Sequence, residues 1–254
     1  MATTAADIIA AETMMASSWP ALRVCLSGRW VLGMADGVTG RANSLFFLDP
    51  NDDKDLEERL DWMEAAYRRI GLKPQIRVTP LAPKTVVNEI KRRGYIFQNP
   101  TVTLKRPIQN DDEDFESLSR GLTSLDHITD EWLDVFITGS PRYADHRATL
   151  KTMLSDMLDE MAFLILSENG KPAATAMAAH HLGLVNVQNV MTLPGMRRKG
   201  FAQDLMKAVF AFAAKKNARF CWVAVEKENT AALTLYRGLG FEDFYGYIYA
   251  GLPK

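Results

Sequence analysis

The two halves of this 254-residue chain follow one order of predicted elements, and this repeat constrains the fold more than any other feature. Each half has a helix, a strand, a second helix, a Gly-aromatic pair and a final strand. Aligning RRGY (92–95) with GLGF (238–241) brings QIRVTP (75–80) over the FCWVAV region (220–225), and TVTLKR (101–106) over the last strand, without a gap. Identities in this register are few, so the repeat is one of pattern, and it predicts two units of similar architecture.

Helical and strand patterns alternate along both halves, which predicts an α/β (α+β) fold. Apolar residues at helical spacing, or in short apolar runs, are separated by Gly, Pro and Asn. Helices are predicted at residues 5–17, 55–71, 85–95, 129–137, 145–159, 202–216 and 229–240. Strands are predicted at residues 30–36, 42–48, 75–80, 101–106, 162–168, 173–181, 186–192, 220–225 and 245–251.

A Pro-led acidic stretch near the middle of the chain, residues 106–121, is the predicted linker between the halves. Its sequence is RPIQNDDEDFESLSRG, and such charged runs beside Pro are typical of connections. The alternative is that its acidic residues form the solvated first turn of a helix. We therefore predict two domains, residues 1–107 and residues 108–254.

The composition is that of a soluble protein with no overall preference for a charged partner. Hydrophobic residues make up 47%, charged residues 24%, and the formal net charge is -1. We therefore expect neither a nucleic-acid partner nor membrane association. No apolar run approaches about 18 residues, and the N-terminus lacks the basic start of a secretory signal, so we expect a cytoplasmic protein.

The two cysteines, Cys25 and Cys221, are both expected to be buried free thiols. Each lies in an apolar run, RVCL and RFCWVAV, and free cysteine is commonly buried. No Cys or His spacing matches a zinc site, so we expect no metal.

A basic Gly loop, PGMRRKGFA at 194–202, precedes the predicted helix at 202–216. Arg197, Arg198 and Lys199 gather where the helix dipole is positive, and no Ser, Thr, Asp or Asn caps the helix. Gly200 has no Cβ, so the backbone can come close to a phosphate there. The loop is therefore interpreted as a pyrophosphate site, although basic loops of this kind are often only solvated surface. Neither the GxxxxGK[ST] nor the GxGxxG pattern is present, which argues against ATP and NAD.

The first half lacks this anion site. In the aligned register RRKGFA faces NDDKDL at 51–56. Its carboxylates would repel a phosphate, and it contains no Gly.

Two segments of the second half resemble the GNAT superfamily of acyl-CoA N-acyltransferases. RRKGFA is similar to the family's [Q/R]-x-x-G-x-[G/A] motif. The second motif, N-x-x-A-x-x-L-Y-x-x-x-G-F, is matched by Asn229, Ala232, Leu235, Tyr236, Gly240 and Phe241. The resemblance covers about residues 160–250. It implies two GNAT-like units, each a mixed, mostly antiparallel sheet flanked by helices, with a degenerate N-terminal unit (1–107) and a catalytic C-terminal unit (108–254).

The resemblance implies acetyl-CoA as cosubstrate and assigns residues to it. Backbone amides of residues 198–202 would hold the pyrophosphate, and the strand at 190–192 would lie along the pantetheine arm. A main-chain N–H near Val190 or Met191 would polarise the thioester carbonyl, and Asn229 would bond to the arm or shape its loop. The full implied set is Val190, Met191, Thr192, Arg197, Arg198, Lys199, Gly200, Phe201, Ala202, Asn229, Ala232 and Tyr236.

Tyr236 and Glu226 are the candidate catalytic residues. The resemblance places Tyr236 near the sulfur, and a neutral phenol can donate a proton to a leaving thiolate. The strand at 186–189 carries no carboxylate, so the general base is open, with Glu226 the best candidate and water-mediated transfer or no base the alternatives. His180 and His181 point to opposite faces of a strand and are expected to be structural or exposed.

The acceptor site is not defined by these motifs. Possible contributors, each also explicable as plain packing, are Arg41, Asn43, Ser44, Trp132, Arg142, Tyr143, Tyr245, Tyr247 and Tyr249.

The resulting prediction is an N-acetyltransferase that transfers acetyl from acetyl-CoA to the primary amine of a small metabolite. Direct transfer in a ternary complex is expected, because no Cys lies within the motifs to carry the acyl group. The protein would be a monomer or homodimer. The alternative is an acyl-CoA-binding sensor or regulatory protein without turnover; an RNA-binding role for the basic loop fits poorly with the net charge.

Overall fold

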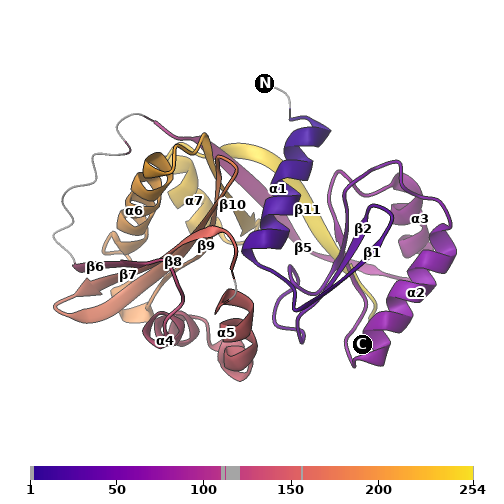
Figure 1. Cartoon of the computed structure of the whole chain (residues 1–254), viewed down its shortest axis with the longest axis horizontal. Helices are drawn as coiled ribbons and strands as arrows, with labels where there is room; N and C mark the ends of the chain where they lie inside the picture. Colours follow the sequence, from indigo (N-terminus) through magenta and orange to yellow (C-terminus); the bar gives the residue numbers. More distant parts are fainter. Residues whose placement is uncertain (1–2, 110–111, 113–120, 156, 254) are drawn as a thin grey trace. The chain divides into compact units, whose positions relative to one another are not determined.

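The computed structural model describes residues 3–109, 112, 121–155 and 157–253 (Figure 1). They form two compact units. The first comprises Met1–Thr103, Val225–Thr230 and Asp243–Lys254, and the second comprises Leu104–Ala224 and Ala231–Glu242. The chain therefore returns to the first unit near its C-terminus, whereas the sequence analysis grouped residues 108–254 together; the division into two evolutionary domains remains a prediction.

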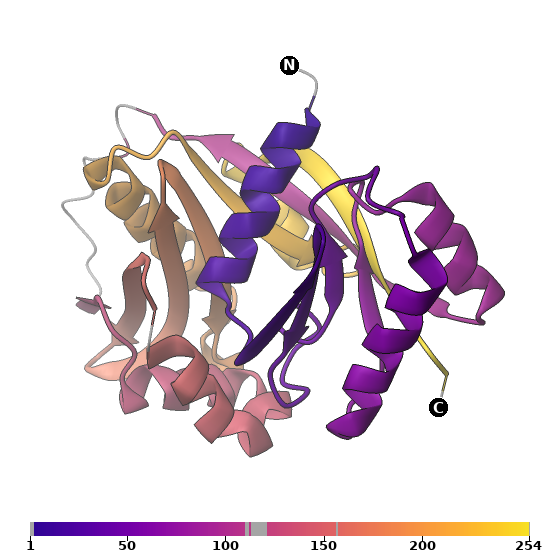
Figure 2. The same ribbon diagram turned by 45° about the vertical axis from the view of Figure 1, so that its right-hand side comes forward.

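The first unit has a small mixed sheet. Strands β1 (Arg23–Ser27), β2 (Trp30–Met34) and β3 (Leu45–Phe47) pair antiparallel in turn, β3 pairs parallel with β4 (Gln75–Val78), and β4 pairs antiparallel with β11 (Glu242–Gly251). In both ribbon views, α1 (Ala5–Ser18) lies on one side of these strands, and α2 (Leu56–Arg69) and α3 (Lys84–Arg92) lie on the other (Figures 1 and 2). The long strand β5 (Ile96–Pro107) begins in this unit and ends in the second.

Local chemistry explains how α1 begins and what it buries. Thr4 and Asp7 form a capping box at its N-terminus. Glu12 on its inner face is fully buried, lies 2.7 Å from Arg77 Nη2 of β4, and accepts a hydrogen bond from the Tyr245 hydroxyl at 2.6 Å. Burial raises the pKa of Glu12, against the opposing effect of Arg77. Tyr245, Tyr247 and Tyr249 are all buried, so in this unit they act as packing residues.

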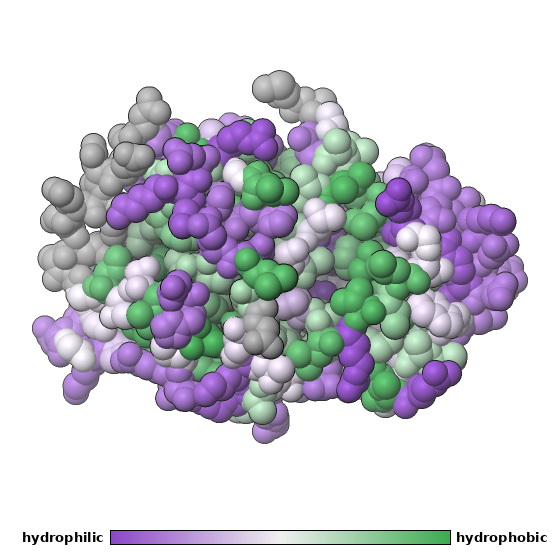
Figure 3. Space-filling view, viewed as in Figure 1, coloured by the Kyte–Doolittle hydropathy of each residue, from purple (hydrophilic) through white to green (hydrophobic). Residues whose placement is uncertain are grey.

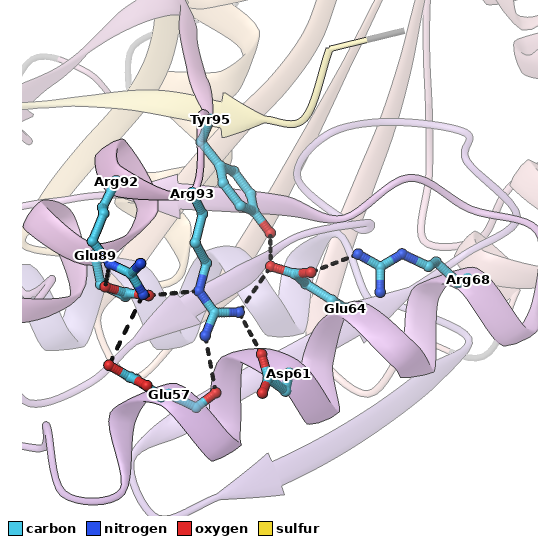
Figure 4. Close-up of polar contacts among 8 residues, drawn as sticks. All are labelled: Glu57, Asp61, Glu64, Arg68, Glu89, Arg92, Arg93 and Tyr95. Carbon is cyan, nitrogen blue, oxygen red and sulfur yellow. Dashed lines mark hydrogen bonds and ion pairs between the residues drawn. The ribbon is translucent and has the colours of Figure 1, made fainter.

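A network of charges joins α2 to α3 in the same unit (Figure 4). Arg93 reaches Glu89, Glu64 and Asp61 at 2.8, 3.1 and 2.6 Å, and Tyr95 donates a hydrogen bond to Glu64. Figure 3 shows hydrophilic residues gathered over these two helices. Their outer side is therefore a solvated, ion-paired surface.

The second unit has a larger sheet that is covered on both faces. Antiparallel pairing joins β6 (Gly121–Leu125), β7 (Glu160–Glu168), β8 (Lys171–His181) and β9 (Leu184–Thr192), and β9 pairs parallel with β10 (Phe220–Glu226). Helix α6 (Phe201–Lys215) packs on one face and α4 (Asp130–Gly139) on the other, as both views show (Figures 1 and 2). Consecutive residues of β7 and β8 are buried accordingly.

The remaining helical segments of this unit are η2 (Pro141–His146), α5 (Arg147–Ser155), η3 (Pro194–Met196) and α7 (Thr230–Gly238). The predicted β7–β8 hairpin turn at NGKP is confirmed, with positive φ at Asn169 and Gly170. The predicted helix 145–159 ends at Ser155, and β1 and β6 were not predicted. Most of the predicted linker, 106–121, lies outside the described residues.

The two cysteines differ in environment. Cys221 is buried as predicted, and burial raises the pKa of its thiol. The expected burial of Cys25 is wrong, because β1 lies at the edge of its sheet, where all its residues but Ser27 are exposed. Within the described part of the chain, no helix is long and apolar enough to span a membrane, and no group of His, Cys, Asp and Glu side chains is arranged to hold a metal ion.

Candidate active site

The site begins where β9 and β10 stop pairing. Their parallel register runs from Phe220 opposite Leu184 to Val223 opposite Val187. Strand β9 continues to Thr192, and from Asn189 onward its residues are partly exposed rather than buried. The last part of β9 is therefore paired only with β8, which leaves its other edge open to an extended ligand.

A β-bulge changes the direction of β9 at this point. Thr175 of β8 pairs with Met191 and Met177 pairs with Gln188, so two residues, Asn189 and Val190, face Ala176 alone. Asn189 has φ +54°, a left-handed conformation that Asn tolerates better than most residues. Its side-chain Nδ2 is buried and has no hydrogen-bond partner among the described residues.

Helix α4 holds the bulge in place. The Trp132 indole N–H donates a hydrogen bond to the Ala176 carbonyl at 3.1 Å. Ala176 is the residue that the bulge leaves without a partner on β9. Trp132 is fully buried, stacks on Phe136 and meets Phe163 edge-on, so it supports the sheet.

The loop after β9 leads directly into the N-terminus of α6. Arg198 and Gly200 both have positive φ, +62° and +84°, and Gly200 is the exposed N-cap without any side-chain cap. The Asp204 N–H donates to the Gly200 carbonyl at 3.0 Å, so the hydrogen bonds of the helix begin at Asp204. A helix N-terminus of this geometry is compatible with an anion, and the pyrophosphate site stays a prediction.

The charged residues of this loop, Arg197, Arg198 and Lys199, are exposed. Arg197 Nε lies 3.5 Å from the Thr192 carbonyl oxygen. Lys199 forms an ion pair with Glu168 at 3.1 Å. Phe201 is buried and Ala202 half-buried, so the first turn of α6 is anchored by Phe201 while its N-terminus stays open.

Tyr236 lies on α7 with its ring against Phe241, at a centroid distance of 5.6 Å. It is 5% exposed, and burial raises the pKa of its hydroxyl above the ordinary value. No hydrogen bond from this hydroxyl to another described residue is present. The phenol therefore stays protonated at physiological pH.

Comparison with known proteins identifies the family of this chain. The model of the family described as "Probable histone acetyltransferase Rv0428c C-terminal" matches residues 5–250, nearly the whole chain. The chain belongs to this family. It is thus an acyl-CoA-dependent acetyltransferase, and the prediction of a GNAT N-acyltransferase is confirmed.

Two sequence relatives support the family. The protein named uncharacterized N-acetyltransferase YobR, from Bacillus subtilis (strain 168), is 25% identical over 242 residues, covering 92% of this chain and 94% of the relative. The [ribosomal protein bS18]-alanine N-acetyltransferase of Escherichia coli (strain K12) is 29% identical over 93 residues, 37% of this chain and 63% of the relative.

Two solved structures support the predicted fold of two GNAT-like units. A GCN5-related N-acetyltransferase from Kribbella flavida has a TM-score of 0.71 at 16% identity, covering 99% of this chain and 96% of that one. A tandem GNAT protein from the clavulanic acid biosynthesis pathway has a TM-score of 0.66 at 12% identity, covering 96% and 88%.

Three of the predicted site residues of this acetyltransferase lie between the end of β10 and the first turn of α7. Glu226 is the last residue of β10, Asn229 lies in the turn that follows, and Ala232 lies in the first turn of α7. Glu226 and Asn229 are exposed, and Ala232 is half-buried. The segment Val225–Thr230 is part of the first compact unit, whereas Ala232 and Tyr236 belong to the second. The Asn229 N–H donates to the Glu226 carbonyl at 2.9 Å, which closes this turn.

The described residues of the first unit include no equivalent anion site. Helix α2 also begins at a left-handed residue, Asp55 at φ +52°, but that residue is acidic. The neighbouring Asp52 accepts hydrogen bonds from Arg59 and from the Arg29 N–H, and these bonds hold its pKa below the ordinary value. Carboxylates thus flank the start of α2, where they would repel an anion.

His180 and His181 each lie beside a carboxylate, which fits the prediction that they are structural or exposed. His180 Nδ1 lies 2.7 Å from Glu160, and His181 Nδ1 lies 2.8 Å from Asp159. Both lie where β8 ends and β9 begins, at the opposite end of β9 from the bulge.

Sequence reasoning missed the bulge at Asn189. The signal was present, because Asn is among the few residues that adopt positive φ readily. The prediction took account of Asn189 only as a residue without a carboxylate.

Proposed function

We propose that the second unit transfers an acetyl group from acetyl-CoA to the primary amine of a small metabolite, by direct transfer in a ternary complex. The observation that carries this proposal is the open, uncapped N-terminus of α6, with left-handed residues at 198 and 200, next to the unpaired end of β9. One continuous stretch of backbone thus offers an anion site followed by a strand edge. This order suits a cosubstrate with a pyrophosphate and an extended amide-bearing arm.

Individual residues have defined tasks in this proposal. Backbone N–H groups from Arg198 to Ala202 would bind the pyrophosphate, with Arg197 and Lys199 adding positive charge. Val190, Met191 and Thr192 would pair with the pantetheine arm, and a main-chain N–H at 190 or 191 would polarise the thioester carbonyl. Asn229 and Ala232 would border the arm beside Tyr236.

The proposed chemistry is attack of a neutral amine on the thioester carbonyl, followed by expulsion of the thiolate. Tyr236 would donate its proton to the leaving sulfur, and the amine proton would leave through water, with Glu226 as the candidate base. Direct transfer is supported by Cys221, the one cysteine described in the second unit, which is buried and has a raised pKa. A thiol in that state is a poor acyl carrier.

The proposed acetyl acceptor is the amine of a small metabolite. The Escherichia coli relative carries the name of a protein-alanine acetyltransferase, so a protein N-terminus is the competing acceptor. The net charge of -1 favours neither a strongly acidic nor a strongly basic polypeptide. The acetyltransferase family gives no support to the non-catalytic sensor alternative.

Substitution of Gly200 tests the proposal. Gly200→Asp would put a carboxylate in the anion site, and we expect it to weaken acetyl-CoA binding by about 100-fold. Gly195→Asp is the matched control, because it adds the same charge in the same loop at a position with open space around it. Calorimetric titration would measure both, with thermal unfolding to show that each variant is folded. Equal affinities for the two variants would contradict the proposed site.

A further inference from the structure

The side chain of Met191 rests on the backbone of helix α4. A Cβ atom added to Gly139, the last residue of α4, would overlap Sδ, Cε and Cγ of Met191. No other glycine with a described environment would meet a side chain so closely. The absence of a side chain at Gly139 is therefore what lets the thioether of Met191 occupy this position.

This contact is held rigidly from both sides. Met191 pairs with Thr175 of β8 immediately after the bulge, so its main chain is fixed in the sheet. Helix α4 is fixed by the buried Trp132, whose indole N–H bonds to the Ala176 carbonyl. The main chain of Met191 cannot move away from Gly139 without disturbing one of these attachments.

Met191 also lies at the point that an acyl group must pass. In the function proposed above, the pantetheine arm runs back along β9 from Thr192 toward the bulge. The Val187–Val223 pair closes the space between β9 and β10 beyond it. Because α6 covers one face of the sheet, the acyl group has to turn toward the other face, where α4 and the Met191 side chain lie.

We infer that Met191, seated on Gly139, sets the length of the acyl group that this enzyme accepts. An acetyl group, or an acyl group one carbon longer, ends before the thioether, whereas a longer chain would have to displace it. The enzyme would therefore be selective for acyl-CoA thioesters of two or three carbons. This inference rests on the proposed CoA site and adds a residue that determines specificity.

Direct binding of acyl-CoA thioesters tests the inference without knowledge of the acceptor amine. Calorimetric titration of the full chain with CoA, acetyl-CoA, butyryl-CoA and hexanoyl-CoA gives the ratio of affinities. We expect hexanoyl-CoA to bind about 10-fold more weakly than acetyl-CoA to the natural protein, a typical cost of extra methylenes in a closed pocket. Met191→Ala should reduce that ratio to about 3-fold or less.

A control separates pocket size from general loosening of the core. Met206→Ala removes an equally large side chain that is fully buried on α6, and it should leave the ratio unchanged. A ratio near one in the natural protein, or a ratio that Met191→Ala does not alter, would overturn the inference alone. Failure of every thioester and of CoA itself to bind would instead refute the CoA site.

The contact itself can be verified by a double-mutant cycle. Gly139→Ala should lower the unfolding temperature, because its methyl group overlaps the Met191 side chain. The same substitution in the Met191→Ala background should cost much less, because the space is then empty. Additive effects of the two substitutions would show that Gly139 and Met191 are not in contact in solution, and the inference would fail.

Discussion

Burial keeps the Tyr236 hydroxyl protonated, as its proposed role as a proton donor requires. The pKa of this phenol is raised by burial alone, so the neutral, proton-bearing form persists to higher pH than for an exposed tyrosine. A leaving thiolate in a water-poor site gains more from such a donor than it would in water. Tyr236 should therefore stay protonated through neutral and mildly alkaline pH.

Removal of the Tyr236 hydroxyl alone tests this role. Tyr236→Phe keeps the ring contact with Phe241, so we expect acetyl-CoA affinity to change little. Turnover should fall by about 100-fold, because general acid catalysis is lost while positioning remains. Steady-state kinetics with a reactive amine, together with calorimetry, would measure the two effects. Normal turnover would show that water or another group protonates the sulfur.

At the scale of elements, local motifs were predictable and contacts between distant segments were not. Gly200, Ala202, Asn229 and Tyr236 belong to short patterns whose spacing follows from one loop and one helix, so the sequence alone was enough to propose them. The contact of Gly139 with Met191 joins residues far apart in the chain, and nothing in either local pattern indicates it. Burial of Cys25 was predicted from an apolar run, but strand order placed β1 at an edge.

The charge network between α2 and α3 makes a prediction about acid stability. Hydrogen bonds from Arg92 and then Arg93 lower the pKa of Glu89 from 4.5 to about 2. A lowered pKa in the folded state stabilises the fold above pH 4.5, and this stabilisation is lost as the pH falls from 4.5 to about 2.

Glu89→Gln should therefore lower the unfolding temperature at pH 7, and the difference from the natural protein should shrink as the pH approaches 2. Glu57→Gln is the control, because Glu57 is exposed and lies 4.0 Å from Arg92. Its unfolding temperature should follow that of the natural protein at every pH. A difference for Glu89→Gln that stays constant from pH 7 to 2 would contradict the ion-pair explanation.

At the scale of the whole molecule, the path of the chain decides whether the two halves can fold as separate fragments. The sequence repeat suggests a cut at 107/108, yet β11 pairs with β4 of the first unit. The Thr103 hydroxyl also donates a hydrogen bond to the Tyr245 carbonyl of β11 at 2.7 Å. The last strand thus completes the sheet of the first unit, although it follows the second motif of the acetyltransferase.

A fragment of residues 108–254 should therefore fail to fold on its own. Without β4 it would expose the edge of β11 and the side chains of Tyr245, Tyr247 and Tyr249, which are buried in the full chain. We expect it to be insoluble when expressed alone, and to become soluble when residues 1–107 are produced in the same cell as a separate chain. Solubility on centrifugation and co-purification of the two fragments would measure this. A soluble fragment 108–254 that binds acetyl-CoA would show that β11 does not need to pair with β4. It would also show that the sequence repeat marks an independent domain.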